Sequence, residues 1–403
     1  MRASLCRLAA NVALLGLASA QTTEPQDGLE VALLNYPDLS LFRSLLGQAP
    51  ESLENVLSDD TNNITVLVPT NEAINAYLTA SGLSNITELK SDDIETFFSY
   101  QILAVSLKGA DFDDPNGMTV PTLLQGDKFN NRSAGPMLEQ QYGERATGQV
   151  VFATHKDKSA RRVKRQDAGP VVNIRAGLAQ DVGMTAVDVK WGTKGINTFQ
   201  VVDSVLVPPK NCSTTIRSFS DDRLTSMDDA LKKSGLWPRI DTSSNVTCLA
   251  PSTEAFKNAG DPQVSGSKSE VGGVVLHHTL GQVAYSNFLE DGMVFESLNN
   301  TKITVTFKGD DIYFNNAKLI EANVLTNNGL LHILDSVIET DNSVSGKSSG
   351  TSSTSAEVPS GTSTEAPSST SSSASSASET NAANALAISY SGVVAVAAGF
   401  LLL

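Results

Sequence analysis

Histidine is scarce in this chain, and three of the histidines lie in motifs that could do chemistry. Only four occur among the 403 residues, and three of these are His277, His278 and His332. Histidine nitrogens bind zinc, so the three could form part of a metal site. A second copy of the pattern, described below, has Gln101 and Gln200 where this copy has His278 and His332. Glutamine forms hydrogen bonds but is a poor metal ligand, so we predict buried hydrogen bonds and no cofactor, and hypothesise that the two exchanged positions touch.

Two aspartates occupy matching places in apolar runs, which read QVVDSVLV around Asp203 and HILDSVIE around Asp335. No nucleophile, general base or metal-ligand spacing accompanies either carboxylate. Hydrogen bonding to nearby backbone amides is therefore the favoured interpretation. The sequence also lacks a P-loop, a dinucleotide glycine pattern, a G-x-S-x-G elbow and a C-x-x-C pair. We predict that the protein is not an enzyme.

The chain is acidic, with 29 Lys+Arg against 44 Asp+Glu and a formal net charge of −15. Such a chain repels phosphate backbones, so we expect no nucleic-acid partner. One segment differs, because KDKSARRVKR, residues 156–165, holds six basic residues in ten. Three interpretations stay open for it. The segment could contact anionic polysaccharides or phospholipid headgroups, be cut by a kexin-like protease at Lys164-Arg165, or be a solvated loop.

Both ends of the chain are typical of targeting signals. Residues 1–20 combine two arginines, an apolar run and a small-residue cleavage site, which predicts a secretory signal peptide. Residues 341–381 are rich in Ser and Thr and predict a disordered, O-glycosylated stalk. Residues 382–403 end in a short apolar run without a basic flank, which predicts a GPI signal with attachment at Asn381, an ordinary single span being the alternative. We expect the protein on the extracellular face of the plasma membrane, or in the cell wall, touching the membrane only through lipid.

The secretory route predicts two further modifications. It is oxidising, so Cys212 and Cys248 are expected to form a disulfide, with two separate buried thiols as the alternative. N-glycosylation requires the pattern N-x-S/T, and several such sites are expected to be used. The acceptors are Asn63, Asn85, Asn131, Asn211, Asn245 and Asn299.

The middle of the chain is an internal repeat. TVLVPTNEA in the first copy corresponds to TCLAPSTEA in the second, and each combines an apolar strand-like run, a proline and the start of a helix. Thr70 and Ser252 are placed to cap that helix with a side-chain oxygen. Glu72 and Glu254 follow in the first turn, where the helix dipole favours a negative charge. A repeat this long predicts two similar domains with separate cores.

Within each copy, helix-like stretches precede strand-like stretches. Apolar residues recur at helical spacing in LSLFRSLLGQ and SMDDALKKSGLW, whereas GQVVFAT, PVVNIRAG, TKITVTFKG, DIYFN and KLIEANVL read as strands. This order predicts an α+β fold with antiparallel-looking strands.

These motifs resemble those of fasciclin domains. TVLVPTNEA and TCLAPSTEA look like the first family motif, and INTFQVVDSVL and GLLHILDSVI look like the second. The central Tyr-His segment of the family is matched by His277-His278, but the first copy has Tyr100-Gln101. The resemblance covers residues 27–208, with an insertion at about 113–170, and residues 212–340. It implies two β-wedge or sandwich domains with packed helices.

The resemblance also implies a function, that of a fungal-type surface glycoprotein in adhesion. The expected partners are cell-surface or matrix proteins and glycans. Two alternatives remain, a surface protein that binds a lipid or small ligand in an apolar groove, and an enzyme acting on cell-wall polysaccharide. The latter would need paired carboxylates in a cleft.

Overall fold

The computed structural model describes residues 28–59, 62–130, 132–146, 148–155 and 172–339. All of them lie in one compact unit, Met1–Gly346, whereas the second unit, Lys347–Leu403, falls outside the described residues. Also outside them are the predicted signal peptide, stalk and GPI site at Asn381, the basic segment with Lys164-Arg165, and Asn131. We call the described residues up to Pro208 domain 1 and those from Asn211 onward domain 2.

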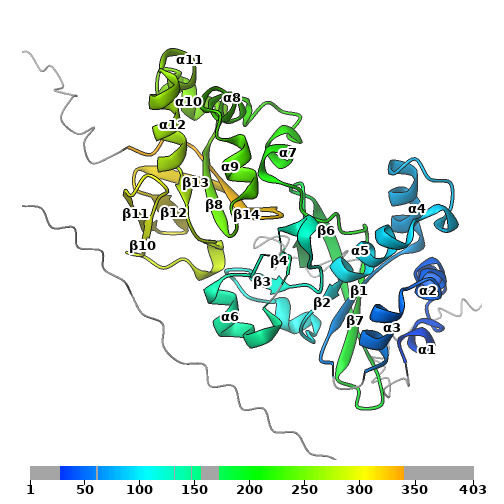
Figure 1. Cartoon of the computed structure of the whole chain (residues 1–403). Helices are drawn as coiled ribbons and strands as arrows, with labels where there is room; N and C mark the ends of the chain where they lie inside the picture. The colour runs from blue at the N-terminus through cyan, green and yellow to red at the C-terminus, as the bar shows by residue number, and fades with distance from the viewer. Residues whose placement is uncertain (1–27, 60–61, 131, 147, 156–171, 340–403) are drawn as a thin grey trace, which may run out of the picture. The chain divides into compact units, whose positions relative to one another are not determined.

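Domain 1 contains a seven-stranded sheet in the order β2-β1-β7-β6-β5-β4-β3 (Figure 1). The strands are β1 (Thr65–Pro69), β2 (Ile102–Leu103), β3 (Met118–Pro121), β4 (Val150–His155), β5 (Val172–Arg175), β6 (Asp181–Trp191) and β7 (Asn197–Val202). 

Domain 2 repeats this sheet strand for strand. Its order is β9-β8-β14-β13-β12-β11-β10, so that β8 corresponds to β1 and β14 to β7. The strands are β8 (Val246–Pro251), β9 (Thr279–Leu280), β10 (Val294–Glu296), β11 (Lys302–Lys308), β12 (Asp311–Phe314), β13 (Ala317–Thr326) and β14 (Gly329–Leu334). The α+β repeat predicted from the sequence is therefore confirmed.

Each sheet is mixed and nearly closed, which differs from the antiparallel arrangement expected. The last strand of each domain returns beside the first and runs parallel to it, as β1–β7 and β8–β14. All other neighbouring strands pair antiparallel. Isolated bridges, Leu103 to Thr122 and Leu280 to Ser297, then join the two ends of each sheet. Because β1 and β8 are buried on both faces, their sequences are almost continuously apolar.

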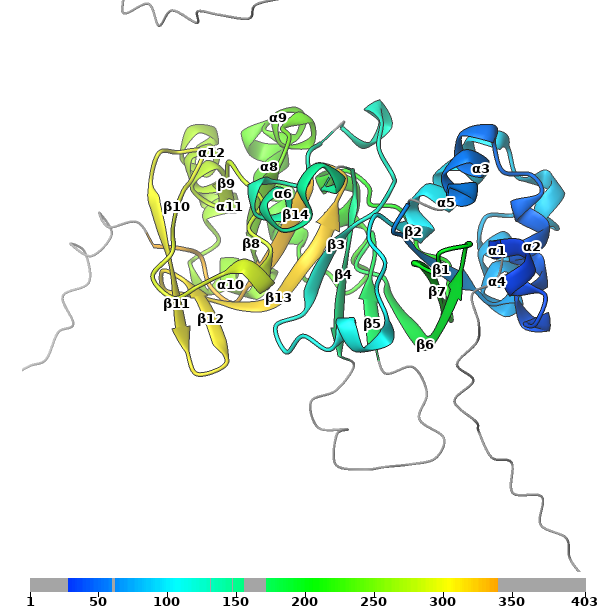
Figure 2. The ribbon, with the colours of Figure 1, turned by 90° about the horizontal axis from the view of Figure 1, so that it is seen from below.

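The helices of domain 1 group beside β1 and β7 (Figure 2). They are α1 (Leu29–Leu33), α2 (Ser40–Leu46), α3 (Glu51–Ser58), α4 (Asn71–Ala80), α5 (Ser91–Gln101) and α6 (Pro136–Tyr142), of which α6 lies apart from the group. Phe42 of α2 packs edge-on against Phe98 of α5, with ring centroids 5.3 Å apart. Val66 and Val68 share this core, whereas Leu67 points to a second core on the opposite face of β1.

Domain 2 has the same two cores. Its helices are α7 (Cys212–Arg217), α8 (Thr225–Ser234), α9 (Trp237–Thr242), α10 (Thr253–Asn258), α11 (Pro262–Ser265) and α12 (Lys268–His277). Met227 and Leu231 of the predicted amphipathic stretch are buried against the sheet, and Leu249 faces the second core. Among the described residues, no helix is both long and apolar enough to cross a membrane.

The range 113–170 is not a single insertion, and this corrects the sequence analysis. It contains β3 and β4, which correspond to β10 and β11 of domain 2. The extra described residues lie between β3 and β4, where residues 122–149 replace the short loop 297–301. We call the described residues of this stretch, 122–130, 132–146 and 148–149, the arm. It contains 3₁₀ turns at Asp127–Phe129 and Gly143–Arg145 as well as α6.

Candidate functional site

The residues of the first motif cap helices. Thr70 Oγ1 accepts a hydrogen bond from the backbone N–H of Ala73 at 3.2 Å, at the start of α4. Ser252 Oγ accepts one from Ala255 at 3.1 Å, at the start of α10. Glu72 and Glu254 lie in the first turns of these helices and are exposed. These residues stabilise helix ends.

The two aspartates of the second motif bind the neighbouring strand. Asp203 Oδ1 accepts a hydrogen bond from the N–H of Gly183 at 2.9 Å, and Asp335 Oδ1 accepts one from Lys318 at 2.8 Å. The main-chain amide of each aspartate donates to the carbonyl of that same partner. Each carboxylate therefore holds the end of the last strand against its neighbour, which is β6 in domain 1 and β13 in domain 2. This role is structural.

His278 belongs to the segment that matches the Tyr-His motif of the family, and it binds the chain that follows β14. His278 Nδ1 lies 2.8 Å from the carbonyl of Val274, and its Nε2 accepts a hydrogen bond from the N–H of Ile338 at 2.8 Å. In domain 1, the Gln101 amide oxygen accepts from the N–H of Leu206 at 2.9 Å, in the orientation that satisfies both ends of the amide. Leu206 and Ile338 occupy equivalent places, so equivalent main-chain amides are bound by glutamine in domain 1 and by histidine in domain 2.

The second exchanged position behaves in the same way. His332 Nδ1 accepts a hydrogen bond from the N–H of Asn323 at 3.2 Å, and its Nε2 lies 2.7 Å from the carbonyl of Ala284. Gln200 Oε1 accepts from a β6 amide at 2.8 Å, and its Nε2 donates to the carbonyl of Leu107 at 3.2 Å. Each position binds main chain, and among the described side chains no hydrogen bond joins the two positions.

Burial keeps both of these histidines neutral. Loss of hydration lowers the pKa of His278 and His332 to about 4, against an ordinary value of 6.5. His277 lies beside His278 with ring centroids 5.5 Å apart. Within the described ranges, no group of three or more His, Cys, Asp or Glu side chains is arranged to hold a metal ion.

The two cysteines contact each other as free thiols. Cys212 begins α7 and Cys248 lies in β8, and both are buried in the same core. A hydrogen bond between the Cys212 thiol and Cys248, together with burial, raises the pKa of Cys212 well above its ordinary value. A disulfide between these residues was predicted from the sequence, whereas in the structure the two thiols are free and in contact.

The described glycan acceptors differ in exposure. Asn85 and Asn299 are exposed, whereas Asn63, Asn211 and Asn245 are half-buried. Asn211 also caps α7, because its Oδ1 accepts a hydrogen bond from the third residue beyond it at 3.0 Å.

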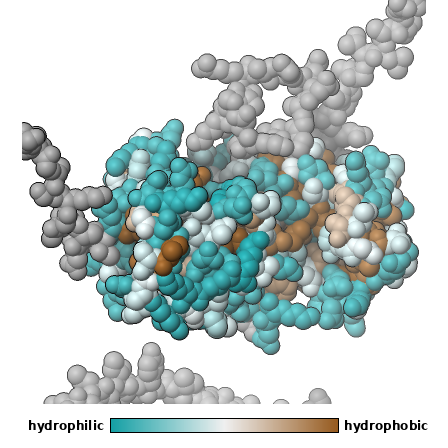
Figure 3. Space-filling model, turned by 90° about the horizontal axis from the view of Figure 1, so that it is seen from above, coloured by the Kyte–Doolittle hydropathy of each residue, from teal (hydrophilic) through white to brown (hydrophobic). Residues whose placement is uncertain are grey.

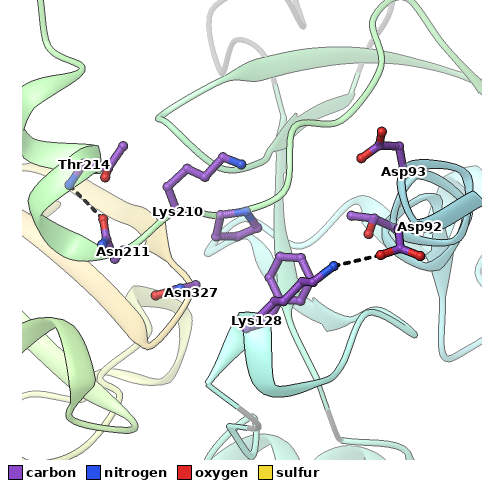
Figure 4. Close-up of a pocket in the computed structure, with 10 residues that line it drawn as sticks. Asp92, Asp93, Lys128, Lys210, Asn211, Thr214 and Asn327 are labelled. Carbon is purple, nitrogen blue, oxygen red and sulfur yellow. Dashed lines mark hydrogen bonds and ion pairs between the residues drawn. The ribbon is translucent and has the colours of Figure 1, made fainter. Parts of the chain in front are cut away.

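A polar pocket of about 370 Å³ lies where the segment between the domains meets α5 and α7 (Figure 4). Its labelled lining residues are Asp92, Asp93, Lys128, Lys210, Asn211, Thr214 and Asn327. Lys128 Nζ lies 3.2 Å from Asp92 Oδ2, and both side chains are about three-quarters exposed (75% and 78%). An exposed pair of this kind contributes little stability.

A second pocket, also of about 370 Å³, is more apolar and lies in domain 1. Leu29, Leu46, Ala49 and Leu57 line it together with Trp191 at the end of β6. The Trp191 side chain is buried, and its indole N–H has no hydrogen-bond partner. The site can therefore accommodate an apolar group.

The outer surface is mainly hydrophilic. Figure 3 shows one face on which hydrophobic side chains form patches among hydrophilic ones. The exposed large hydrophobic residues are Val31, Leu34, Met137, Ile196, Val264, Val294, Phe307 and Ile320. They come from both domains, so the described surface is suited to contacts at more than one place.

The residue that ties the arm to domain 2 is not among those predicted from the sequence. Arg132 is 4% exposed, and its guanidinium donates to the carbonyls of Thr326 at 3.1 Å and Gly329 at 3.0 Å and to the Tyr285 hydroxyl. The only signal in the sequence was an arginine inside a glycan acceptor motif, which does not indicate burial.

Comparison with known proteins gives the family. A Fasciclin domain model matches residues 37–158 and 222–340, more than half of the chain. The chain belongs to the fasciclin domain family. The first match spans β1 to β4 and the second spans β8 to β14, so each match lies in one of the two sheets, and the structure is a tandem pair of fasciclin domains.

Similar proteins share fasciclin domains at low identity. A Fasciclin-like arabinogalactan protein of Arthroderma benhamiae is 24% identical over 308 residues, covering 76% of this chain and 65% of that protein. Periostin of Homo sapiens is 29% identical over 147 residues, covering 35% of this chain and 17% of periostin. The chain thus spans less than two thirds of either relative. A solved FAS1 domain pair from the insect cell adhesion molecule Fasciclin I aligns with a TM-score of 0.34 and 14% identity, covering 76% of this chain and 98% of that one.

Proposed function

We propose that this chain is a non-enzymatic cell-surface glycoprotein whose fasciclin domain pair binds cell-surface or matrix proteins and glycans. In this proposal a signal peptide directs the chain into the secretory route, and a Ser/Thr-rich stalk holds the pair off the membrane. A GPI lipid attached at Asn381 anchors the chain to the plasma membrane. The chain either stays there or is later transferred to the cell wall. The observation that carries the proposal is the pair of fasciclin domains in one chain.

The described residues support binding rather than catalysis. The motif residues that the sequence singled out are occupied in holding helix ends, strand ends and loops, as shown for Thr70, Asp203 and His278. Of the two carboxylates in the polar pocket, Asp92 pairs with a lysine. An enzyme acting on cell-wall polysaccharide remains the disfavoured alternative, since it needs two carboxylates placed on either side of a bound sugar.

Oxidation of the cysteine pair belongs to the same proposal. In the secretory lumen a dithiol–disulfide oxidant would accept two electrons and two protons from Cys212 and Cys248 as the S–S bond forms. The bond would join the start of α7 to β8, with an expected stabilisation of about 3 kcal/mol. Intact-mass analysis of the secreted protein should show a loss of two hydrogens. Two thiols that alkylate after denaturation without reductant would reject the bridge.

The binding function is tested by probing the secreted full chain against an array of matrix proteins and glycans. We expect saturable binding to at least one class of probe, unchanged in the variant Asp92→Asn, Asp93→Asn. Release of sugar fragments from any polysaccharide probe, abolished in the same variant, would instead favour the enzyme. Uniform absence of binding would reject the adhesion proposal.

The apolar pocket favours one second candidate, the binding of a lipid or small ligand. Its volume of about 370 Å³ lies at the lower end of the range for ligand pockets, and its lining is more apolar than that of the polar pocket. Native mass spectrometry of the full chain with a neutral acyl lipid should then show a one-to-one complex, lost on Ala49→Trp. Absence of a complex would exclude this candidate.

A further inference from the structure

We propose that the glycan acceptor Asn245 is closed in the folded protein, because the arm of domain 1 docks on its side chain. An N-glycan at Asn245 and a docked arm would exclude each other. The glycan part of this inference rests on the proposed secretion of the chain, whereas the docking part does not.

Asn245 has a matched counterpart in domain 1. Asn63 lies just before β1 and Asn245 just before β8, and Thr65 and Thr247 of the two acceptor motifs lie at the start of these equivalent strands. In both copies the asparagine is half-buried and the threonine is fully buried. The two acceptors therefore sit at the same place in the same fold.

The threonines of these acceptor motifs have structural roles. Thr65 Oγ1 accepts a hydrogen bond from the N–H of Leu107 at 2.6 Å, and Thr247 Oγ1 accepts one from Ala284 at 2.9 Å. Each hydroxyl also donates to a carbonyl two residues earlier in the same loop, at 2.9 and 2.8 Å. A threonine here holds the loop that follows β2 or β9. The acceptor motif is therefore explained by the fold and does not by itself indicate a glycan.

Only the domain 2 acceptor is covered. Asn245 Nδ2, the atom that would carry a sugar, donates a hydrogen bond to Ser133 Oγ of the arm at 2.9 Å. Asn245 Oδ1 is buried without a partner. Among the described residues, the side chain of Asn63 has no hydrogen bond. No described segment packs on Asn63 in the way that the arm packs on Asn245.

Neighbours on both sides hold Ser133 in place. Before it, Arg132 donates three hydrogen bonds into domain 2 through its guanidinium, to two carbonyls and to Tyr285. After it, the carbonyl of Ala134 accepts a hydrogen bond from the Tyr285 hydroxyl at 3.3 Å. Hydrogen bonds that involve a charged group are about twice as strong as neutral ones, so Arg132 acts as the main anchor.

Packing leaves little room beside these bonds. Ala134 and Leu138 of the arm form one buried cluster with Val283, Leu325 and Leu330 of domain 2. In the same stretch of the arm, a Cβ added at Gly135 would overlap the Val283 side chain. A bulky group at the junction would have to separate surfaces that are packed at van der Waals distance.

The modification itself would alter the contact. N-glycosylation forms a bond between Nδ2 and the first sugar carbon, releases a proton from the amide, and frees the pyrophosphate of the lipid-linked donor. The amide keeps one hydrogen, but the sugar must then occupy space taken by Ser133 and its neighbours. Transfer occurs on the extended chain, so a molecule modified at Asn245 could not dock the arm, and we expect quality control to remove it before it reaches the folded, secreted monomer.

Glycopeptide mapping of the full chain, secreted from a glycosylating host and purified as folded monomer, tests this directly. We expect occupancy at Asn63 to exceed that at Asn245 at least tenfold. Equal occupancy at the two acceptors would overturn the proposal. A chain without glycans at any acceptor would reject the proposed secretory function and leave the docking to be decided by labelling.

Thiol labelling tests the docking without secretion. Full-length chains carrying Asn63→Cys or Asn245→Cys, made in a host that does not glycosylate, are reacted with a maleimide-linked polymer and compared with the parent chain. We expect Cys labelling at position 245 to be at least tenfold slower than at position 63, and Arg132→Ala to remove most of that difference. Equal labelling rates at positions 63 and 245 in chains that keep Arg132 and have the circular dichroism of the parent chain would overturn the proposal.

Discussion

The two domains put different side chains at two equivalent buried positions, and the difference separates hydrogen bonding from charge. Domain 1 uses Gln101 and Gln200, whereas domain 2 uses His278 and His332, yet all four bind main-chain groups of the sheet or of the chain that leaves it. The fold requires an acceptor and a donor at these places. It does not require a group that ionises, so at these two positions only domain 2 carries a side chain whose protonation depends on pH near neutrality.

Acidification should therefore have the largest effect, and it should act on domain 2. Burial holds the pKa of His278 and His332 at about 4 in the folded state, below the ordinary 6.5. The unfolded chain binds these protons first, so the stabilisation is complete above pH 6.5 and is lost as the pH falls towards 4. At pH 5 we expect domain 2 to lose about 4 kcal/mol of unfolding free energy relative to pH 7.

Each domain has its own fluorescent probe for this measurement. The chain has two tryptophans, Trp191 in domain 1 and Trp237 in domain 2, so urea unfolding of Trp191→Phe and Trp237→Phe reports on the domains separately. The double variant His278→Gln, His332→Gln copies domain 1 and should lose most of the acid sensitivity. If this variant lost as much stability as the parent chain, other groups would be responsible.

The next largest difference in stability between the domains is expected at Gly329, where the backbone of the neighbouring strand lies very close. Gly329 begins β14, and a Cβ there would overlap the carbonyl oxygen of Val246, whereas Asn197 occupies the equivalent place in domain 1. We expect Gly329→Ala to reduce the unfolding free energy of domain 2 by about 3 kcal/mol, because the strands must separate. Asn197→Ala is the control and should cost about 1 kcal/mol, for one lost hydrogen bond. Equal effects would contradict the assigned register.

Helix caps should affect the two domains alike. Thr70→Ala and Ser252→Ala each remove one hydrogen bond to a first-turn amide, and each should cost about 1 kcal/mol in its own domain. Thermal unfolding of the two single variants, followed by the tryptophan of the affected domain, measures this. A cost confined to one variant would show that the caps are not equivalent.

The smallest effect should be a gain. Leu178 and Ala179 both have a positive φ, 56° and 55°, in the turn between β5 and β6, whereas the matching turn of domain 2 has Asn315 at 53°. Asparagine tolerates this conformation better than leucine. Leu178→Asn should therefore raise the unfolding free energy by about 0.5 kcal/mol, and Asn315→Leu should lower it by a similar amount. A loss in the first variant would mean that packing by Leu178 outweighs its backbone strain.

Duplication made much of the fold predictable from the sequence. Thr70 and Ser252, and likewise Asp203 and Asp335, recur at matching places, so local patterns for strands and helix starts could be read twice. The parallel pairing of β1 with β7 could not be read in this way, because nothing in two apolar strands far apart in sequence records their relative direction. The same limit led β3 and β4 to be assigned to an insertion.

The junction between the domains was beyond local patterns altogether. Arg132 is buried by residues that follow it by more than 150 positions, and its acceptors are carbonyls, which every residue has. Asn245 likewise appeared as an ordinary glycan acceptor, because its contact with Ser133 depends on how the arm folds. Such contacts are a property of tertiary structure.

Cell adhesion by the anchored full chain tests the central claim most directly. Cells that display the protein would be bound to surfaces coated with matrix protein or glycan, then treated with a phosphatidylinositol-specific phospholipase. We predict that the protein appears in the medium as an intact folded pair and that the additional adhesion disappears with it. Protein that stays with the cells, or adhesion that persists after its release, would contradict the account.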